Sequence, residues 1–387
     1  MTTRIGLGNG CPVFKKCGGC QLQNMTYEEQ LRYKQSKMVG LLGRYGRVSP
    51  VLGMENPAHY RCKVQAAFAK TSGGIISGVY QSTSGRVVPV DSCMLEDERA
   101  DAIIVTIRKL MKSFKLKPYD REERTGFVRH VLVRKGYYTG QIMVVLVTAG
   151  EEFPSCRSFV NALLGRHPEI TTLVQNVAGR SHKMLLGSRN ITLYGAGHIE
   201  DTILGRTFCI SPNSFYQVNP QMTTVLYSKA LEFMGLTGKE TVIDAYCGTG
   251  TIGILAAARA GQVIGVEVNG DAVRDAKDNA KRNGVDNAKF YEGDASDFMV
   301  DMAQVGERAD VLIMDPPRAG CSMRFLKAAV QLAPKRMVYV SCGPDTLARD
   351  LGFLTKNGYK AQKIQPVDMF PHTNHVECVV SLVRKER

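Results

Sequence analysis

The chain has 387 residues, and its 50 Lys and Arg side chains outnumber 36 Asp and Glu, which leaves a formal net charge of +14. Hydrophobic residues make up 44% and charged residues 22%, a composition that excludes a disordered, collagenous or coiled-coil protein and predicts two globular domains. No apolar run reaches the ~18 residues of a membrane span, so we expect a cytoplasmic protein with no membrane partner.

In such a protein the eleven cysteines are expected to be metal ligands, catalytic thiols or buried side chains rather than disulfides. The first of them form a short segment, Cys11 to Cys20, with the spacing C-x5-C-x2-C, and Cys93 follows alone. Closely spaced cysteines with glycine between two of them are typical of a metal site. Four thiolates suit zinc or an iron–sulfur cluster, and the spacing leaves both open.

The sequence after Cys20 predicts a helix near residues 26–44, which could pack on the second domain. Thr26 can cap its start, and Glu28 and Glu29 fall in the first turn, where negative charge stabilises a helix. From about Val51, short β-rich runs alternate with glycine and polar turns, which predicts an α+β domain with a mostly antiparallel sheet. The expected strands cover Val64–Phe68, Gly126–Val133, Gln141–Val147 and Ile191–Tyr194.

After about Gln217 the pattern changes to strand-like runs that alternate with helical stretches. This alternation is typical of βαβ units and predicts a mostly parallel, doubly wound sheet. We therefore expect two domains, at residues 1–215 and 216–387. The expected elements of the second are Thr241–Tyr246, Ile252–Ala260, Val263–Val268, Asp271–Asn283, Ala288–Tyr291, Val311–Asp315 and Met337–Ser341.

The net charge is divided unequally between these two parts. Residues 1–215 hold 29 basic and 16 acidic side chains, a net of +13, whereas residues 216–387 hold 21 and 20, a net of +1. Basic side chains beside aromatic ones form the usual surface for single-stranded or looped RNA, so the first domain is expected to bind RNA. The residues concerned are Lys15, Lys16, Arg61, Lys63, Arg121, Arg124, Arg129, Arg134, Lys135, Phe127, Tyr137 and Tyr138.

The second domain contains the elements of a site for an adenosyl ligand. Val242–Gly250 is an apolar strand, an acidic residue and a glycine-rich turn, and glycines there let the backbone approach a ligand closely. About twenty residues further on, Glu267 ends a second strand, where a carboxylate can accept both hydroxyls of a ribose. Gly293 and Asp294 follow the next expected strand.

Two further motifs point to chemistry at the same edge of the sheet. Asp315 and two prolines follow an apolar strand, and the prolines stiffen the loop where ligands bind in such folds. Cys342 ends another strand, and a thiolate is suited to conjugate addition at an electron-poor ring carbon. A base is also needed, and His375 and Glu377 are the candidates.

Together these motifs resemble the S-adenosylmethionine-dependent RNA uracil-C5 methyltransferase family. The resemblance covers the second half in order and extends to the cysteines of the first. One departure is Ser341-Cys-Gly-Pro344, where the family has Ser-Cys-Asn-Pro, so the loop around the thiol has fewer hydrogen bonds than usual. The motifs are Phe215-Tyr-Gln-Val-Asn219, Asp244-Ala-Tyr-Cys-Gly-Thr-Gly250, Asp315-Pro-Pro-Arg318, Ser341-Cys342 and His375-Val-Glu377.

The resemblance implies a Rossmann-like class I methyltransferase domain at the C-terminus and an α+β RNA-binding domain with a cysteine cluster at the N-terminus. Cys342 would be the nucleophile that adds to C6 of uracil, and Glu377 the base that removes the proton from C5. The residues expected to contact S-adenosylmethionine are Gln217, Tyr246, Thr251, Glu267, Asp294 and Asp315.

The resemblance also assigns the cysteines. Those that match the ligands of a 4Fe-4S cluster in the ribosomal-RNA members of the family are Cys11, Cys17, Cys20 and Cys93. Cys62 lies where relatives usually carry Asn and is expected not to be a ligand. Methyl transfer has no redox step, so a cluster would have a structural or RNA-positioning role.

The implied function is methylation of a specific uridine in 23S rRNA to 5-methyluridine, by a monomer. One alternative is a uridine in the T-loop of tRNA, although relatives with that substrate generally lack the cysteine cluster. Another is an iron–sulfur RNA-binding factor whose methyltransferase domain is inactive. Because the chain starts close to the cysteine cluster, we expect RNA specificity to come from the central domain.

Overall fold

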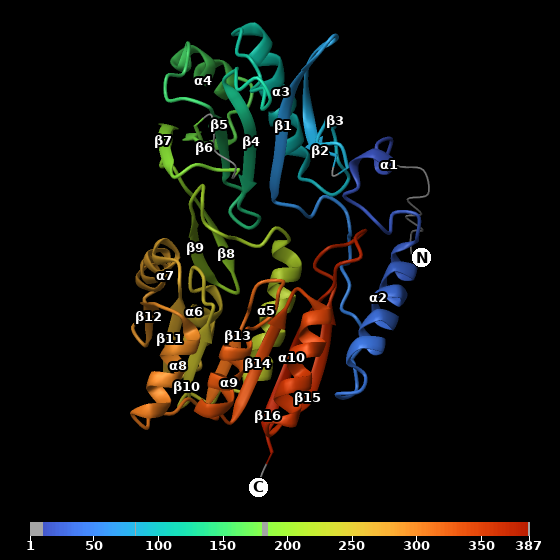
Figure 1. Cartoon of the computed structure of the whole chain (residues 1–387). Helices are drawn as coiled ribbons and strands as arrows, with labels where there is room; N and C mark the ends of the chain where they lie inside the picture. Colours follow the sequence, from blue (N-terminus) through green and yellow to red (C-terminus); the bar gives the residue numbers. More distant parts are fainter. Residues whose placement is uncertain (1–10, 82, 180–184, 386–387) are drawn as a thin grey trace.

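The structure is a computed structural model, and it describes residues 11–81, 83–179 and 185–385. Two lobes are visible, and each is built around a seven-stranded sheet (Figure 1). No helix within the described ranges is long and apolar enough to cross a membrane.

The first lobe contains a mainly antiparallel sheet. Its strands are β1 (Lys63–Thr71), β2 (Gly74–Tyr80), β3 (Val87–Pro89), β4 (Val128–Lys135), β5 (Ile142–Thr148), β6 (Ile170–Val177) and β7 (Arg189–Tyr194). They lie in the order β3-β2-β1-β4-β5-β6-β7, and β5 and β6 are the one parallel pair among the described strands of this sheet. Helices α3 (Glu98–Ser113) and α4 (Cys156–Leu164) cover its apolar face, and their side chains share one core with it.

The second lobe contains a mostly parallel sheet. Its strands are β10 (Thr241–Ala245), β11 (Gln262–Glu267), β12 (Ala288–Glu292), β13 (Val311–Met314), β14 (Arg336–Ser341), β15 (Tyr359–Val367) and β16 (Glu377–Arg384). The order is β12-β11-β10-β13-β14-β16-β15. The pairs from β12 to β14 are parallel, and β16 pairs antiparallel with both β14 and β15.

Helices cover both faces of this second sheet (Figure 1). One face holds α5 (Pro220–Met234), α6 (Thr251–Ala257) and α7 (Gly270–Arg282), and the other holds α8 (Ala295–Gln304), α9 (Met323–Leu332) and α10 (Pro344–Lys356). Within β10, Val242 and Ile243 point to opposite cores, which is why the strand is apolar without alternation. This arrangement confirms the doubly wound methyltransferase-like sheet that the sequence predicted.

A two-stranded hairpin lies between the lobes in sequence. It consists of β8 (Ile199–Ile203) and β9 (Arg206–Ile210). The side chains of Asn279 and Asn283 on α7 accept hydrogen bonds from the backbone N–H groups of Cys209 and Thr207, at 3.0 and 2.9 Å. The domain boundary expected near residue 215 lies after this hairpin in the sequence. The hairpin itself is hydrogen-bonded to α7 of the second lobe.

The N-terminal helices are α1 (Phe14–Cys17) and α2 (Tyr27–Leu42). Thr26 caps α2 as predicted: its hydroxyl accepts from Glu29 N–H at 3.3 Å, and the Glu29 carboxylate accepts from Thr26 N–H at 2.8 Å. This reciprocal capping box satisfies two backbone donors at the helix start.

Helix α2 packs on the second sheet. Met38 and Leu42 are fully buried in the core beneath α8, α9 and α10. Beyond the helix, Val48 and Leu52 form parallel bridges to Ile364 and Val367 of β15. The segment from α2 to Leu52 thus packs with the second lobe.

Candidate functional site

A cavity of about 710 Å³ lies at the carboxyl ends of strands β10, β11, β13 and β14. β10 is the first strand of the parallel sheet, and its neighbours β11 and β13 extend the sheet in opposite directions. Ligands of open α/β sheets bind outside the strand ends at such a switch point. The position alone therefore marks this cavity as a ligand site.

The loop between β10 and α6 lines one wall of the cavity. Gly250 has a φ of +79°, and a Cβ there would lie 2.9 Å from Ala276 and Phe290, so no larger residue fits. Tyr246 has a φ of +62°, which is unusual for a residue with a side chain. Its ring packs on Phe325, with centroids 4.9 Å apart. The tight turn and this contact fix the loop.

Two carboxylates on the next loops are already held in place by backbone donors. Glu267 accepts from Gly248 N–H at 3.1 Å and from Asn269 N–H at 3.0 Å. Asp294 caps α8 by accepting from Ser296 N–H at 2.7 Å, and hydrogen bonds from Ser296 hold its pKa below the usual value. Both side chains line the cavity, and the position of Glu267 at the end of β11 suits the hydroxyl groups of a ribose.

Two more carboxyl groups are buried beside the cavity. Burial raises the pKa of Asp244 to about 8, although the N–H of Gly253, 2.8 Å from Asp244 Oδ2, acts in the opposite direction. Burial also raises the pKa of Asp315 to about 7. A positively charged ligand would stabilise the ionised forms of these groups. S-adenosylmethionine, a cationic sulfonium with a ribose, fits this donor set.

Cys342 and Glu377 face each other across two paired strands. Ser341 at the end of β14 is the partner of Cys378 in β16, so Cys342 and Glu377 meet at the same edge. Both line the cavity together with Asp315. The antiparallel return of β16 is therefore what brings a residue near the C-terminus to the thiol.

The charges around this pair act on both residues. Burial raises the pKa of the Cys342 thiol to about 11, and the carboxyl groups of Glu377 and Asp315 add to the rise, whereas Arg318 lowers it. The pKa of Glu377 rises to about 8 because the group is buried and lies near Asp315, again opposed by Arg318. A carboxyl group with a pKa near neutral pH is suited to proton transfer.

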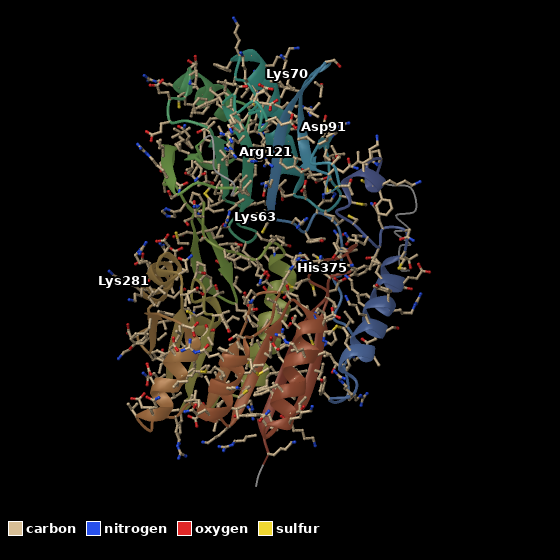
Figure 2. The ribbon with its side chains drawn as sticks, viewed as in Figure 1. Lys63, Lys70, Asp91, Arg121, Lys281 and His375 are labelled. Carbon is tan, nitrogen blue, oxygen red and sulfur yellow. The ribbon has the colours of Figure 1, made fainter. Side chains whose placement is uncertain are left out.

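The cavity gathers every residue expected to bind the cofactor, the expected nucleophile and one of the two candidate bases. The lining includes Gln217, Tyr246, Thr251, Glu267, Asp294, Asp315, Cys342 and Glu377. His375, the other candidate base (labelled in Figure 2), is absent from the described lining. Its ring meets the Phe370 ring edge-on, with centroids 6.1 Å apart, and burial lowers its pKa.

Sequence reasoning missed several side chains that line the cavity. Arg318 directly follows the Asp-Pro-Pro motif, and the need for a cation near two acids could have identified it. Phe215, which is 70% exposed, lies two residues before Gln217 in the motif Phe215-Tyr-Gln-Val-Asn219. Arg61, which the sequence assigned only to the RNA-binding surface, and Phe370 come from outside the predicted strand ends.

The four N-terminal cysteines lie near one another. Burial raises the pKa of the Cys20 thiol to about 12, and the negative charges of Cys93, Cys17 and Cys11 contribute. A Cβ on Gly19 would lie 3.3 Å from Cys17 Sγ, so the turn there is tight. Among the described residues, however, no group of three or more His, Cys, Asp or Glu side chains is arranged to hold a metal ion.

A family model described as tRNA (uracil-5-)-methyltransferase matches residues 26–385. An uncharacterized RNA methyltransferase of Halalkalibacterium halodurans is 46% identical over 380 residues, which cover 97% of this chain and 83% of the relative. One from Clostridium tetani is 44% identical over 374 residues, covering 96% and 81%.

A similar solved structure is that of the Pyrococcus abyssi tRNA (uracil-54, C5)-methyltransferase in complex with S-adenosyl-L-homocysteine. It is 29% identical, with a TM-score of 0.80, and the match covers 94% of this chain and 86% of that one. The similarity between the two folds extends over both lobes, because neither lobe alone makes up 94% of this chain.

The parallel sheet and its cavity define an S-adenosylmethionine-dependent methyltransferase that acts on RNA. Within that class, the chain belongs to the tRNA (uracil-5-)-methyltransferase family, whose reaction is methylation of uracil at C5. The RNA uracil-C5 methyltransferase family and the dependence on S-adenosylmethionine that the sequence motifs implied are thereby confirmed.

Proposed function

We propose that the protein transfers a methyl group from S-adenosylmethionine to C5 of a specific uridine in 23S rRNA. The observation that carries the proposal is the meeting of Cys342, Glu377 and Asp315 in one cavity at the switch point of the sheet. The basic first half supports an RNA substrate, and the four cysteines resemble those of ribosomal-RNA methyltransferases.

Cys342 is the proposed nucleophile. Its thiolate adds to C6 of uracil, which makes C5 electron-rich enough to accept a methyl group. S-adenosylmethionine, when bound, supplies that methyl group as an electrophile. The sulfur lies near Arg318, whose charge favours the thiolate against the neighbouring carboxyl groups.

Glu377 is the proposed base. After methylation the C5 proton must leave so that the bond between sulfur and C6 can break, and the Glu377 carboxylate accepts this proton. Its position opposite Cys342 at the end of β16 suits both groups acting on one ring. Asp315 and the two prolines after it form the adjoining wall and would orient the pyrimidine edge.

The remaining cavity residues are proposed to bind the cofactor. Glu267 would accept the ribose hydroxyls, and Asp294 would lie near the adenine. Tyr246, Gln217 and Thr251 would complete the contacts, since all line the same cavity. Uracil in structured RNA must be extruded to reach Cys342, which costs a few kcal/mol of unstacking.

A 4Fe-4S cluster is proposed to bind Cys11, Cys17, Cys20 and Cys93. The mutual effect of these thiols on the pKa of Cys20 supports their proximity. Binding would require the sulfur atoms to draw together, because they are not arranged around a metal ion beforehand. A cluster there would supply rigidity to the N-terminal segment rather than electrons for methyl transfer.

Metal analysis tests this part of the proposal. Protein purified without oxygen should be brown and contain about four irons per chain. Cys93→Ser should lose the iron, whereas Cys62→Ala, at a buried cysteine outside the set, should keep it. Stoichiometric zinc without visible absorbance would contradict the iron–sulfur assignment.

Methylation of tRNA is a second candidate function. The structurally similar Pyrococcus abyssi protein is named for uracil-54 of tRNA, and it matches 94% of this chain. The two candidates are separated by incubating the purified protein with S-adenosylmethionine and either 23S rRNA or tRNA, followed by nucleoside mass spectrometry. We expect 5-methyluridine in 23S rRNA. Product in tRNA alone would favour the alternative, and no product in either would favour an inactive RNA-binding factor.

A further inference from the structure

A second cavity of about 470 Å³ adjoins the catalytic one. Arg61 and Val218 line both, so the two spaces are neighbours. The second cavity is otherwise formed mainly by β1 and β2 of the first lobe. Its other described lining residues are Lys63, Gln65, Ala67, Gly78, Val79, Tyr80 and Glu96.

Cations gather at this cavity without matching carboxylates. In the described part of the chain, Arg61, Lys63 and Arg134 form no ion pair. Lys63 on β1 is the direct partner of Arg134 on β4, so two positive side chains stand on adjacent strands. The cavity lining holds one acid, Glu96, against two cations.

Arg134 does not line the cavity itself, but it lies next to Lys63 and is short of hydrogen-bond partners. Its side chain is buried, with 4% of the residue exposed, and one guanidinium nitrogen donates to the Ser214 carbonyl at 2.7 Å. Within the described residues, its Nε and Nη1 have no hydrogen-bond partner, and neither has Arg61 Nε. Buried cationic donors without an anion are costly, and an anion bound in the cavity at Arg61 would reduce that cost.

The electrostatics agree with this geometry. Burial, together with the charges of Arg134 and Arg61, lowers the pKa of Lys63 to about 8. The cations therefore repel one another in the absence of a ligand, and a phosphate between them would reverse the sign of the interaction.

An aromatic side chain completes the wall of the cavity. Tyr80 lines it, and the Arg121 guanidinium lies 4.4 Å from the centre of the Tyr80 ring. Cationic groups beside an aromatic ring are the usual elements of a site for single-stranded nucleic acid. A cavity of this size also lies within the range of about 300–1,000 Å³ typical of ligand pockets.

We propose that this second cavity binds the RNA nucleotide next to the target uridine, with its phosphodiester against Arg61 and Lys63 and its base against Tyr80. The inference rests on the proposed function, because it assumes that a uridine occupies the catalytic cavity. Neighbouring nucleotides are covalently linked, so the one beside an extruded uridine is within reach of an adjoining space. The shared wall at Arg61 provides that continuity.

The test compares two lysines of the same strand. Figure 2 shows Lys63 at the end of β1 nearest the second lobe and Lys70 at the opposite end, where it is exposed. Binding of a fluorescein-labelled oligouridylate is measured by anisotropy at several salt concentrations. Lys63→Gln should weaken binding about tenfold and reduce the salt slope by about one, whereas Lys70→Gln should change affinity by less than about twofold.

Equal affinities and salt slopes for Lys63→Gln and Lys70→Gln would overturn the inference. If Lys63→Gln fails to fold, judged by its binding of S-adenosylhomocysteine, then Gln65→Glu serves instead, because Gln65 is an exposed residue of the cavity wall. This variant should also weaken RNA binding about tenfold, and unchanged binding would count against the inference.

Methyl transfer by the unaltered protein separates this failure from that of the proposed function. If the unaltered protein methylates RNA and the variants bind RNA as tightly as it does, only the inference about the second cavity is overturned. Absence of any transfer to total cellular RNA would overturn the proposed function and, with it, the inference.

Discussion

The thiol of Cys342 lies near two carboxyl groups that oppose its ionisation, and this conflict bears on how the reaction begins. Its pKa is raised to about 11, yet conjugate addition requires the thiolate. Because the pKa of Glu377 is near 8, this neighbour is mostly protonated at neutral pH, which removes one of the opposing charges. Arg318 provides the favourable charge.

Replacing the nucleophile tests its role. Cys342→Ala should lower turnover about a thousandfold or more, because no other group can add to C6, and should leave S-adenosylmethionine binding unchanged. The matched control is Cys156→Ala on α4, outside the cavity lining, which should retain full activity. Methyl transfer from a radiolabelled cofactor and calorimetric cofactor binding are the measurements. Normal turnover by Cys342→Ala would end this mechanism.

Replacing the base should stop the reaction one step later. Glu377→Gln keeps the size of the side chain but cannot accept the C5 proton, so methylated RNA should remain attached to Cys342. The adduct would appear on a denaturing gel as a slowly migrating protein–RNA band. The double variant Cys342→Ala/Glu377→Gln should give no such band, and a band in that variant would contradict the assignment.

The raised pKa of Glu377 predicts a pH dependence. Since the group acts as a base only when deprotonated, and its pKa is about 8, kcat should increase with pH below this value by about tenfold per unit. Steady-state rates between about pH 6.5 and about pH 8.5 measure this. A flat profile over that interval would exclude Glu377 as the titrating base.

At the level of single residues, sequence patterns identified the cavity well but incompletely. Glu267 and Asp294 follow strand ends and could be found by spacing, whereas the pairing of Glu377 with Cys342 depends on β16 and came from the family resemblance. Arg61 reaches the cavity from the first half of the chain. Such a contact is set by tertiary packing, which leaves no local pattern.

At the scale of elements, helix α2 holds the loop that leads to the proposed base. Lys34 is completely buried, and its amine lies 2.6 Å from Asp368 Oδ1 and 3.1 Å from the Phe370 carbonyl. Tyr27 donates to Asp368 Oδ2 at 3.0 Å. Phe370 lines the catalytic cavity, so these contacts connect α2 to the site.

Breaking this ion pair should destabilise the protein. Lys34→Met leaves Asp368 buried without its cation, which costs about 3–5 kcal/mol, whereas Arg32→Met on the exposed side of α2 should change stability by less than about 0.5 kcal/mol. Urea unfolding measures both. Lys34→Met/Asp368→Asn, which removes both charges, should recover part of the loss. Equal stability of Lys34→Met and Arg32→Met would show that the pair contributes little.

Elements with a strong local signal were predicted, and those defined by distant pairing were not. The capping box at Thr26 and the β10–α6 turn have residue-level signatures. The antiparallel strands β15 and β16 were missed, and nothing local shows that β16 inserts between β15 and β14.

At the scale of the whole molecule, the charge division has a structural counterpart. The net charge of +13 belongs to residues 1–215, and the catalytic cavity lies mainly in the nearly neutral remainder. Arg61 lines both cavities, so the basic part borders the site directly. This arrangement suits an enzyme that holds RNA with one lobe and modifies it with the other.

The most direct test of the central claim is mass mapping of 5-methyluridine in 23S rRNA and tRNA from cells that lack the gene for this protein. The account predicts that one or more methylated uridines disappear from 23S rRNA while those of tRNA remain, and that the gene restores them but its Cys342→Ala form does not. Loss from tRNA alone, or restoration by the Cys342→Ala form, would contradict it.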